Sequence, residues 1–279
     1  MRILATLLAW LITTAMLAVA VPIAWVQLNL IDDNGFAALS QRAAHNPALQ
    51  AAVAGELANQ AVWLIRERGL AVDYSQVRDI TAAYTAGPAF PPRFARAMQG
   101  AHHSMFADDG SGEWVIDLSA MLGDTAFRSA QSTATDYDVS EPLAPPLAVS
   151  APESLPAGPL HALAGWGRWV SLGAAVLTGV GALLTLLAAR RRGRALTGLG
   201  VSALLAGAIG WAGVEVVRRY LNDAFSATLN EAAVHRIADA MVVTGVAGLH
   251  QWLNLTLAAG GVLVAVGVIV ATLGGLRKS

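Results

Sequence analysis

The chain has 279 residues, of which 55% are hydrophobic and only 13% carry a charge. An ordinary soluble domain is about 25% charged, so this deficit indicates long segments that lie in lipid. The sequence contains no cysteine, which excludes structural disulfides and thiolate metal ligands.

Four apolar segments are long enough to cross the hydrocarbon core of a bilayer, which takes about 20 residues of helix. None of the four carries a charged residue near its centre. They cover residues 3–27, 169–189, 195–217 and 252–276. The sequence therefore predicts an all-α membrane protein with four transmembrane helices and a mainly helical extracytoplasmic domain inserted between helices one and two.

The basic residues orient these spans. Arg2 precedes the first span, a run of arginines at 190–194 joins the second and third, and a basic pair at 277–278 follows the fourth. None of these three segments contains Asp or Glu, and basic flanks stay in the cytoplasm. We therefore expect a multi-pass protein with both termini cytoplasmic and with residues 28–168 and 218–250 extracytoplasmic.

The first span, residues 1–27, has two interpretations. Ala18-Val19-Ala20 fits the small-residue cleavage site of a secretory signal peptide. Against cleavage, a single arginine precedes the span, and the apolar run continues past the site to Ile31. An uncleaved signal anchor is the favoured prediction and a cleaved signal peptide the alternative. Both place the next segment outside.

The extracytoplasmic segment is acidic. Residues 28–165 contain 15 acidic residues against 7 arginines and no lysine, a net charge of −8. A nucleic-acid-binding surface needs the opposite sign, so we expect no nucleic-acid partner. The segment divides into a helical domain at 28–141 and a linker at 142–165. Six prolines make that linker extended and semi-rigid.

Three helices are predicted in the 28–141 domain. Asn46 suits the cap and Pro47 the first position of a helix that ends before Gly69. A second helix is expected over 73–87, because Asp73 can cap it and a Gly-Pro pair ends it. Apolar residues at steps of four predict a third over 92–106.

A short strand is predicted at 114–118, where apolar residues alternate with less apolar neighbours. Residues 166–279 form the three-helix transmembrane region. An apolar stripe after Tyr220 predicts that the third span continues as an amphipathic extracytoplasmic helix over about 218–243. The glycines at 245–248 are expected to form the turn into the fourth span.

The pair His102 and His103 is the candidate catalytic site. These histidines precede Asp108 and Asp109, an arrangement open to acid–base chemistry or metal binding. His102 falls on the apolar face of its helix, so a buried, hydrogen-bonded histidine is the plainer interpretation.

Glu231, His235 and Asp239 are the candidate metal ligands. They lie four residues apart on one helix face and offer oxygen and nitrogen ligands to a divalent metal. The plainer interpretation is a solvated face, because metal sites normally draw ligands from more than one element. The sequence has no common hydrolase or nucleotide-binding motif, and we expect no cofactor.

Two further features concern the membrane region. Glu215, Arg218 and Arg219 predict an interfacial ion pair, with a transport role as the alternative. Glycines in the third and fourth spans allow close helix approach, and packing within the chain is favoured over a dimer motif. These glycines are Gly207, Gly210 and Gly213 in the third span and Gly260, Gly261 and Gly267 in the fourth.

Two segments carry a resemblance to known proteins: residues 46–53, and the run from Phe94 through His102 to 114–118. The chain resembles a group of uncharacterised integral membrane proteins of high-GC Gram-positive, actinobacterial-type bacteria. That group pairs one N-terminal span and a helical outer domain with three further spans and an arginine-rich inner loop. The resemblance covers nearly the whole chain through loose motifs. It implies the same topology and a bacterial plasma membrane, and it carries over no functional residue.

Three functions fit the sequence. The leading hypothesis is a non-enzymatic envelope protein, an interaction or assembly factor in the lipid bilayer that binds a protein partner or forms a homo-oligomer. The first alternative is a transporter or channel component, although the spans offer mainly Thr178, Thr185 and Ser202 as polar groups. The second alternative is a membrane-bound envelope hydrolase or transferase that uses the candidate residues above.

Overall fold

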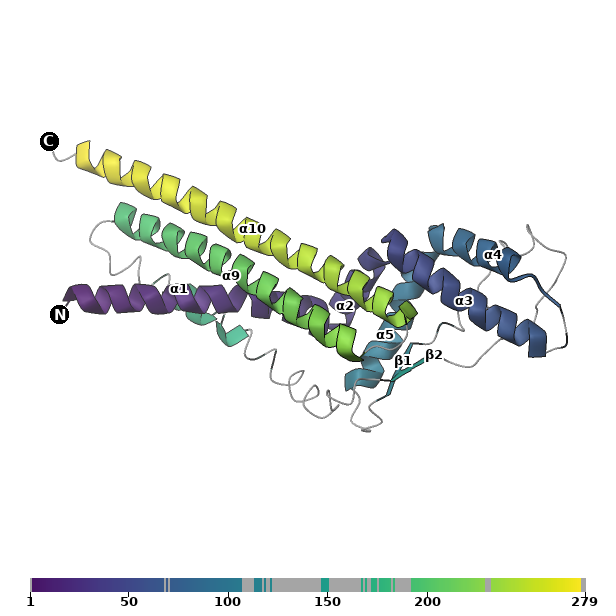
Figure 1. Cartoon of the computed structure of the whole chain (residues 1–279). Coiled ribbons are helices and arrows are strands. Elements are labelled where there is room, and N and C mark those ends of the chain that lie inside the picture. The colour runs from purple at the N-terminus through teal and green to yellow at the C-terminus, as the bar shows by residue number, and fades with distance from the viewer. Residues whose placement is uncertain are drawn as a thin grey trace. The chain divides into compact units, whose positions relative to one another are not determined.

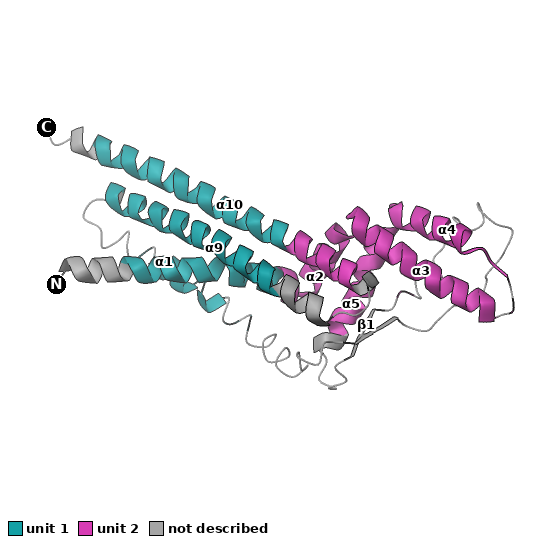
Figure 2. Ribbon diagram, in the orientation of Figure 1, with its two compact units in different colours: residues 1–28, 165–220, 246–279 teal, residues 29–164, 221–245 magenta. Residues whose placement is uncertain are grey.

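Figure 1 shows the protein as a computed structural model of the whole chain, which divides into two compact units (Figure 2). Unit 1 comprises Met1–Leu28, Gly165–Tyr220 and Val246–Ser279, and unit 2 comprises Asn29–Ala164 and Leu221–Gly245. The structure describes residues 2–67, 69, 71–106, 113–116, 118, 121, 147–150, 167, 169, 172–174, 176–181, 183, 192–228 and 232–276.

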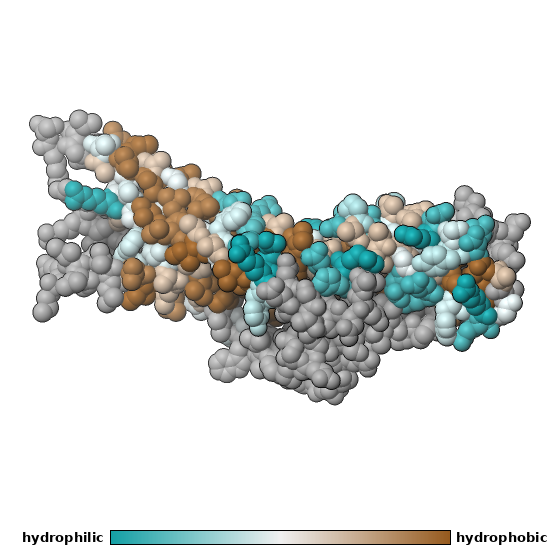
Figure 3. Space-filling view, viewed as in Figure 1, coloured by the Kyte–Doolittle hydropathy of each residue, from teal (hydrophilic) through white to brown (hydrophobic). Residues whose placement is uncertain are grey.

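Three helices of the described chain are long and apolar enough to cross a membrane. The helices are α1 (Arg2–Val26), which continues into the short π-helix η1 (Gln27–Ile31), α9 (Arg192–Thr228) and α10 (Ala232–Leu276). The candidate spans are Trp10–Ile31, Gly193–Tyr220 and His235–Leu273. In Figure 3, hydrophobic residues cover much of the visible face of α9 and α10.

The predicted span at 169–189 is described only in part. The described positions between Gly167 and Leu183 are helical, and they include a shorter apolar helix, Leu172–Gly181. The fourth transmembrane helix therefore stays a prediction.

Polar side chains join α1 to α9 inside unit 1. The indole Nε1 of Trp10 donates a hydrogen bond of 3.1 Å to the carbonyl of Gly198. One turn further along, the hydroxyls of Thr14 and Ser202 lie 2.9 Å apart, and both side chains are buried. Such bonds hold membrane helices together, because lipid offers a polar group no other partner.

Glycines form the seam between α9 and α10. A Cβ at Gly200 would lie 2.7 Å from the carbonyl oxygen of Gly260, and one at Gly267 would lie 2.5 Å from the backbone nitrogen of Thr197. Gly207 and Gly210 face Leu257 and Leu253 of α10 at similar distances. The prediction of close packing within the chain is confirmed for Gly207, Gly210, Gly260 and Gly267, and Gly200 is a further glycine that was not predicted. Gly213 and Gly261 meet nothing within 4 Å.

The helix predicted over 218–243 is described on both sides of 229–231, as the last part of α9 to Thr228 and the first part of α10 from Ala232, and residues 229–231 lie outside the described part of the chain. The prediction for the glycines that follow is wrong. Residues 245–248 are not a turn, since α10 runs through them without a break. Gly248 instead gives room to Trp25 of α1, whose indole Cζ2 lies 3.4 Å from the position that a Cβ would take.

Unit 2 is built mainly from four helices: α2 (Asp33–Ala43), α3 (Pro47–Glu67), α4 (Tyr74–Ala86) and α5 (Phe90–Phe106). The three predicted helices are confirmed as α3, α4 and α5, and α2 was not predicted. Asn46 caps α3 through a bond of 2.9 Å from the N–H of Ala48 to its Oδ1. After α3, Gly69 has a φ of 75°, which is strained for any residue with a Cβ.

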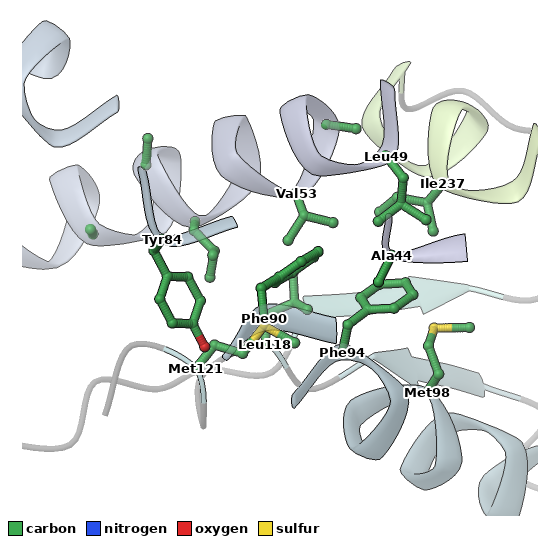
Figure 4. Packing of buried hydrophobic residues seen from close by; sticks show 14 of the residues in the cluster. Ala44, Leu49, Val53, Tyr84, Phe90, Phe94, Met98, Leu118, Met121 and Ile237 are labelled. Carbon is green, nitrogen blue, oxygen red and sulfur yellow. The ribbon is translucent and has the colours of Figure 1, made fainter. Parts of the chain in front are cut away.

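The core of unit 2 lies between α3 and α5 and includes part of α10 (Figure 4). Phe90, Phe94 and Met98 recur every four residues on one face of α5 and are fully or nearly fully buried. They face Leu49 and Val53 of α3. This apolar stripe explains why the sequence of α5 forms a helix and which side of it is covered.

A two-stranded antiparallel pair accompanies the helices. β1 (Glu113–Ile116) confirms the strand predicted near 114–118. Its partner β2 (Leu147–Ser150) falls within the stretch predicted to be a proline-rich linker. The sequence 147–150 lies between prolines but contains none, so all of its backbone N–H groups are free to pair. The predicted turn at 108–112 lies outside the described residues.

Candidate functional site

The candidate histidines meet a carboxylate that the sequence did not predict. Nδ1 of His102 lies 2.8 Å from Oδ1 of Asp33, and Nε2 of His103 lies 2.9 Å from Oδ2 of the same side chain. Asp33 is in the first turn of α2, directly after Asp32, which caps that helix through the N–H of Gly35. The predicted acidic partners, 108–109, lie outside the described residues.

His102 is a buried part of the domain. Its side chain is only 5% exposed, and its ring stacks on Phe36 with the ring centroids 4.6 Å apart. Its second nitrogen, Nε2, lies 3.0 Å from the carbonyl oxygen of Leu30. Both ring nitrogens therefore face oxygen atoms of the domain, and these contacts hold the ring in place. The plainer interpretation of His102 is confirmed.

His103 differs from its neighbour in exposure. Its side chain is 69% exposed, and Asp33, its partner, is 38% exposed. A carboxylate that orients an exposed imidazole is one element of an acid–base site, but a site also needs a nucleophile or a bound substrate in the same place. His103 therefore contributes an oriented, solvent-facing imidazole.

The candidate metal ligands do not form a group in the part of the chain that the structure describes. His235 and Asp239 lie one turn apart on α10, and Glu231 is outside the described residues. Among the described side chains no three His, Asp or Glu residues are placed to hold a metal ion. Asp33, His102 and His103 are likewise not placed to hold a metal ion.

The ion pair predicted at the end of the third span is confirmed. Arg218 donates two hydrogen bonds to Glu215, of 3.0 Å from Nε and 2.8 Å from Nη2. Arg219 donates a third, longer bond of 3.3 Å.

A polar cluster in the membrane region was missed. His250 of α10 stacks on Trp211 of α9, with ring centroids 3.8 Å apart and an angle of 7° between the planes. The indole Nε1 of Trp211 donates a bond of 3.1 Å to Oδ1 of Asn254, one turn after His250. Nε2 of His250 is buried and has no hydrogen-bond partner among the residues that the structure describes. In the sequence, the one feature that marks this cluster is His250 itself, an ionisable residue next to the apolar segment 252–276.

These features define a helical protein in which three of the described helices are long and apolar enough to cross a membrane, together with a small helical unit that has its own core. No protein family, curated protein or solved structure matches the chain. Its function is therefore argued from its own residues.

Proposed function

We propose that this chain is a membrane-anchored, non-enzymatic envelope protein whose helical domain docks a protein partner. The apolar helices, with the predicted span at 169–189, would anchor it in the lipid bilayer. The basic flanks of the spans favour an orientation with both termini in the cytosol and the acidic 28–168 segment outside. In that orientation the domain meets partners in the cell envelope.

One observation carries this proposal. In the described part of unit 2, outside the candidate spans, two large apolar side chains are exposed: Trp63 by 49% and Tyr74 by 39%. Trp63 lies one turn before the end of α3, and Tyr74 is the first residue of α4, which packs along α3. Both therefore lie near the end of the helix pair where the chain passes from α3 to α4, and we call them the aromatic tip.

Tryptophan and tyrosine dominate the binding energy of protein interfaces, because they bury a large area at a small cost in side-chain entropy. The rest of the described α3–α4 pair turns its large apolar residues inward, toward Leu57, Val77 and Ile80. An exposed Trp and Tyr at one end of such a pair fit a docking surface better than a solvated one.

A photo-crosslinking amino acid at position 63 or 74 of the full-length protein tests this in membranes. We expect crosslinking to a protein from both positions and little from Ala51. Ala51 is also exposed on α3 but lies twelve residues from Trp63, about 18 Å along the helix. Trp63→Ala should weaken the captured complex by about 2 kcal/mol, roughly 30-fold. A second copy of the chain as the captured protein would identify a homo-oligomer.

Equal crosslinking from all three positions would remove the aromatic tip as a docking surface. The free energy of unfolding of Trp63→Ala serves as the control, since an exposed residue should alter binding and not stability.

A transport role is the second candidate, because His250 favours it. This residue lies inside the candidate span His235–Leu273, and an ionisable side chain within a membrane segment marks a functional site by default. Liposomes that contain the protein should then show proton or ion flux. His250→Phe, which can still stack on Trp211, should abolish that flux. A wild-type protein without flux removes this candidate.

An envelope hydrolase or transferase gains less from the geometry. Both nitrogens of His102 are bonded to oxygen acceptors, which leaves His103 as the histidine of the pair that faces solvent. A hydrolase assay on envelope extracts that His103→Ala abolishes would restore this alternative.

A further inference from the structure

The exposed side of α5 differs in charge from the segment that contains it. Arg93, Arg96, Gly100 and His103 recur at steps of three and four residues, and all four are exposed. Residues at these steps lie on one side of a helix. The opposite side of α5 packs into the core of unit 2 (Figure 4). We call the four exposed residues the basic face of α5.

Charge is unevenly distributed between α5 and its surroundings. The 17 residues of α5 contain two arginines and no Asp or Glu. The rest of the 28–165 segment has 5 arginines against 15 acidic residues, so its net charge is 5 − 15 = −10. The field of such a segment repels anions, whereas the arginines of α5 attract them at short range. The basic face is therefore a local site for an anionic group.

Arg96 is the central cation of this face. Among the described side chains, no carboxylate forms an ion pair with Arg96. Arg93 lies one turn earlier and has a further interaction within the chain. An exposed guanidinium offers several N–H donors in one plane, which match the two oxygens of a carboxylate. Arg96 is thus the arginine of the face that we expect to hold an anion.

Gly100 leaves open space beside Arg96. It lies one turn after Arg96, and a Cβ at this position would meet nothing within 4 Å. Because glycine has no side chain, a ligand can approach the helix backbone closely here. A carboxylate above Gly100 would lie within reach of the Arg96 side chain, which is long and extends along the helix surface.

The face ends at His103. Nε2 of this histidine lies 2.9 Å from Oδ2 of Asp33, whose other oxygen lies 2.8 Å from Nδ1 of His102. This carboxylate is thus engaged by two imidazoles and not by an arginine of the face. The binding part of the face is therefore the stretch from Arg93 to Gly100.

We propose that the basic face of α5 binds a carboxylate of the partner protein, with Arg96 as the anchor. This inference rests on the proposed function, in which unit 2 docks a protein, and it names the chemistry of the surface that docks: one that presents Asp or Glu. A polyanion such as a phosphate polymer suits the face less well, because the acidic surroundings repel a ligand with many negative charges. A single carboxylate interacts mainly with the arginine next to it.

A labelled helical peptide with two glutamates one turn apart serves as the probe, and its glutamine counterpart is the blank. Fluorescence anisotropy measures binding to the purified full-length protein in mild detergent. Arg96→Glu should weaken binding roughly tenfold or more, since a buried arginine–carboxylate contact is a typical hot spot. Arg78→Glu is the matched control, because Arg78 is an exposed arginine of α4 and the change in net charge is the same. It should alter binding by less than about twofold.

Gly100→Leu tests the site without a change in charge. The leucine side chain would fill the open space beside Arg96, so binding should again weaken roughly tenfold. Gly55→Leu in α3 is the control, because a Cβ at Gly55 also meets nothing within 4 Å. The melting temperatures of both variants show whether the fold is intact, and we expect no decrease in either, as leucine favours helix over glycine.

Three results would overturn the inference: no binding of the glutamate peptide by the wild type, equal weakening by Arg96→Glu and Arg78→Glu, or wild-type binding by Gly100→Leu. Displacement of the peptide by pyrophosphate at a lower concentration than by unlabelled peptide would also overturn it, since the site would then be one for phosphate. Crosslinking from positions 63 and 74 tests the aromatic tip separately. Capture there without peptide binding would remove the basic face and leave the proposed function in place.

Discussion

Oδ1 of Asp33, in the first turn of α2, lies 2.8 Å from Nδ1 of His102, near the end of α5. The two residues are 69 positions apart in the chain. Through His102 the same contact reaches the carbonyl of Leu30 in η1. One buried imidazole therefore links the start of the domain, where the chain leaves the first apolar helix, to the helix that carries most of the aromatic core.

Asp33→Ala should destabilise unit 2. The change removes the Oδ1 atom that lies 2.8 Å from Nδ1 of the buried His102, and the loss of such a buried bond costs about 1–3 kcal/mol. Thermal unfolding in mild detergent, followed by circular dichroism, measures the loss. Asp33→Asn keeps an acceptor at the same place and should cost less.

His103→Ala is the matched test for the exposed half of the same carboxylate. Its side chain is 69% exposed, so we expect a change below about 1 kcal/mol. A loss as large as that of Asp33→Ala would show that the exposed pair, and not the buried one, stabilises the domain.

Local signals explain which helices of the domain could be predicted. α3 begins at Pro47 after a capping Asn46 and is followed by Gly69 at a positive φ, features that are readable in the sequence. α2 could not be found in this way. Of its residues only Leu39, Ser40 and Ala43 are buried, and such a helix depends on tertiary packing rather than on its own pattern.

The wrong prediction at 245–248 has a physical origin. Glycine marks either a turn or a close approach of two elements, and the sequence at 245–248 does not tell them apart. The structure shows the second case, because Gly248 lies against Trp25. The Asp33–His102 contact is also hidden in the sequence, since a pairing across 69 positions leaves no local pattern.

Thr14→Val should weaken the contact between α1 and α9. The valine keeps the shape of the side chain but removes the hydroxyl that lies 2.9 Å from Ser202. Hydrogen bonds between membrane helices contribute about 0.6 kcal/mol on average and at most about 1.7 kcal/mol, and we expect a loss in this range. Thr256→Val is the control, because the exposed hydroxyl of Thr256 bonds to the carbonyl of Trp252 in its own helix and, within the described chain, to no other helix. Equal losses in both variants would assign the effect to the substitution and not to the helix contact.

Asp73 gives the stability of α4 a dependence on pH. The hydrogen bond from the backbone N–H of Ser75, with a further one from the Ser75 side chain, holds the pKa of Asp73 below its ordinary value of 3.8. A carboxyl whose pKa is lower in the folded state stabilises the fold above its ordinary pKa. This contribution is lost as the pH falls from 3.8 through the folded value.

Asp73→Asn isolates this contribution, because asparagine is also a good helix cap but carries no charge. The wild type should have the higher melting temperature at pH 6, and the difference should shrink as the pH approaches 3. A difference that is the same at both pH values would show that the charge of Asp73 makes no contribution.

Alanine substitutions along α9 should separate glycines that face backbone from those that face side chains or open space. A Cβ at Gly200 would lie 2.7 Å from the carbonyl of Gly260, which cannot move without shifting α10, so Gly200→Ala should cost about 1–3 kcal/mol. Gly207→Ala should cost less, because its nearest neighbour is the flexible side chain of Leu257. Gly213→Ala meets nothing within 4 Å and should be neutral or stabilising by up to about 1 kcal/mol, as alanine favours helix over glycine. Unfolding in detergent ranks the three variants, and a Gly213→Ala protein as unstable as Gly200→Ala would mean that the seam between α9 and α10 lies on a different face of α9.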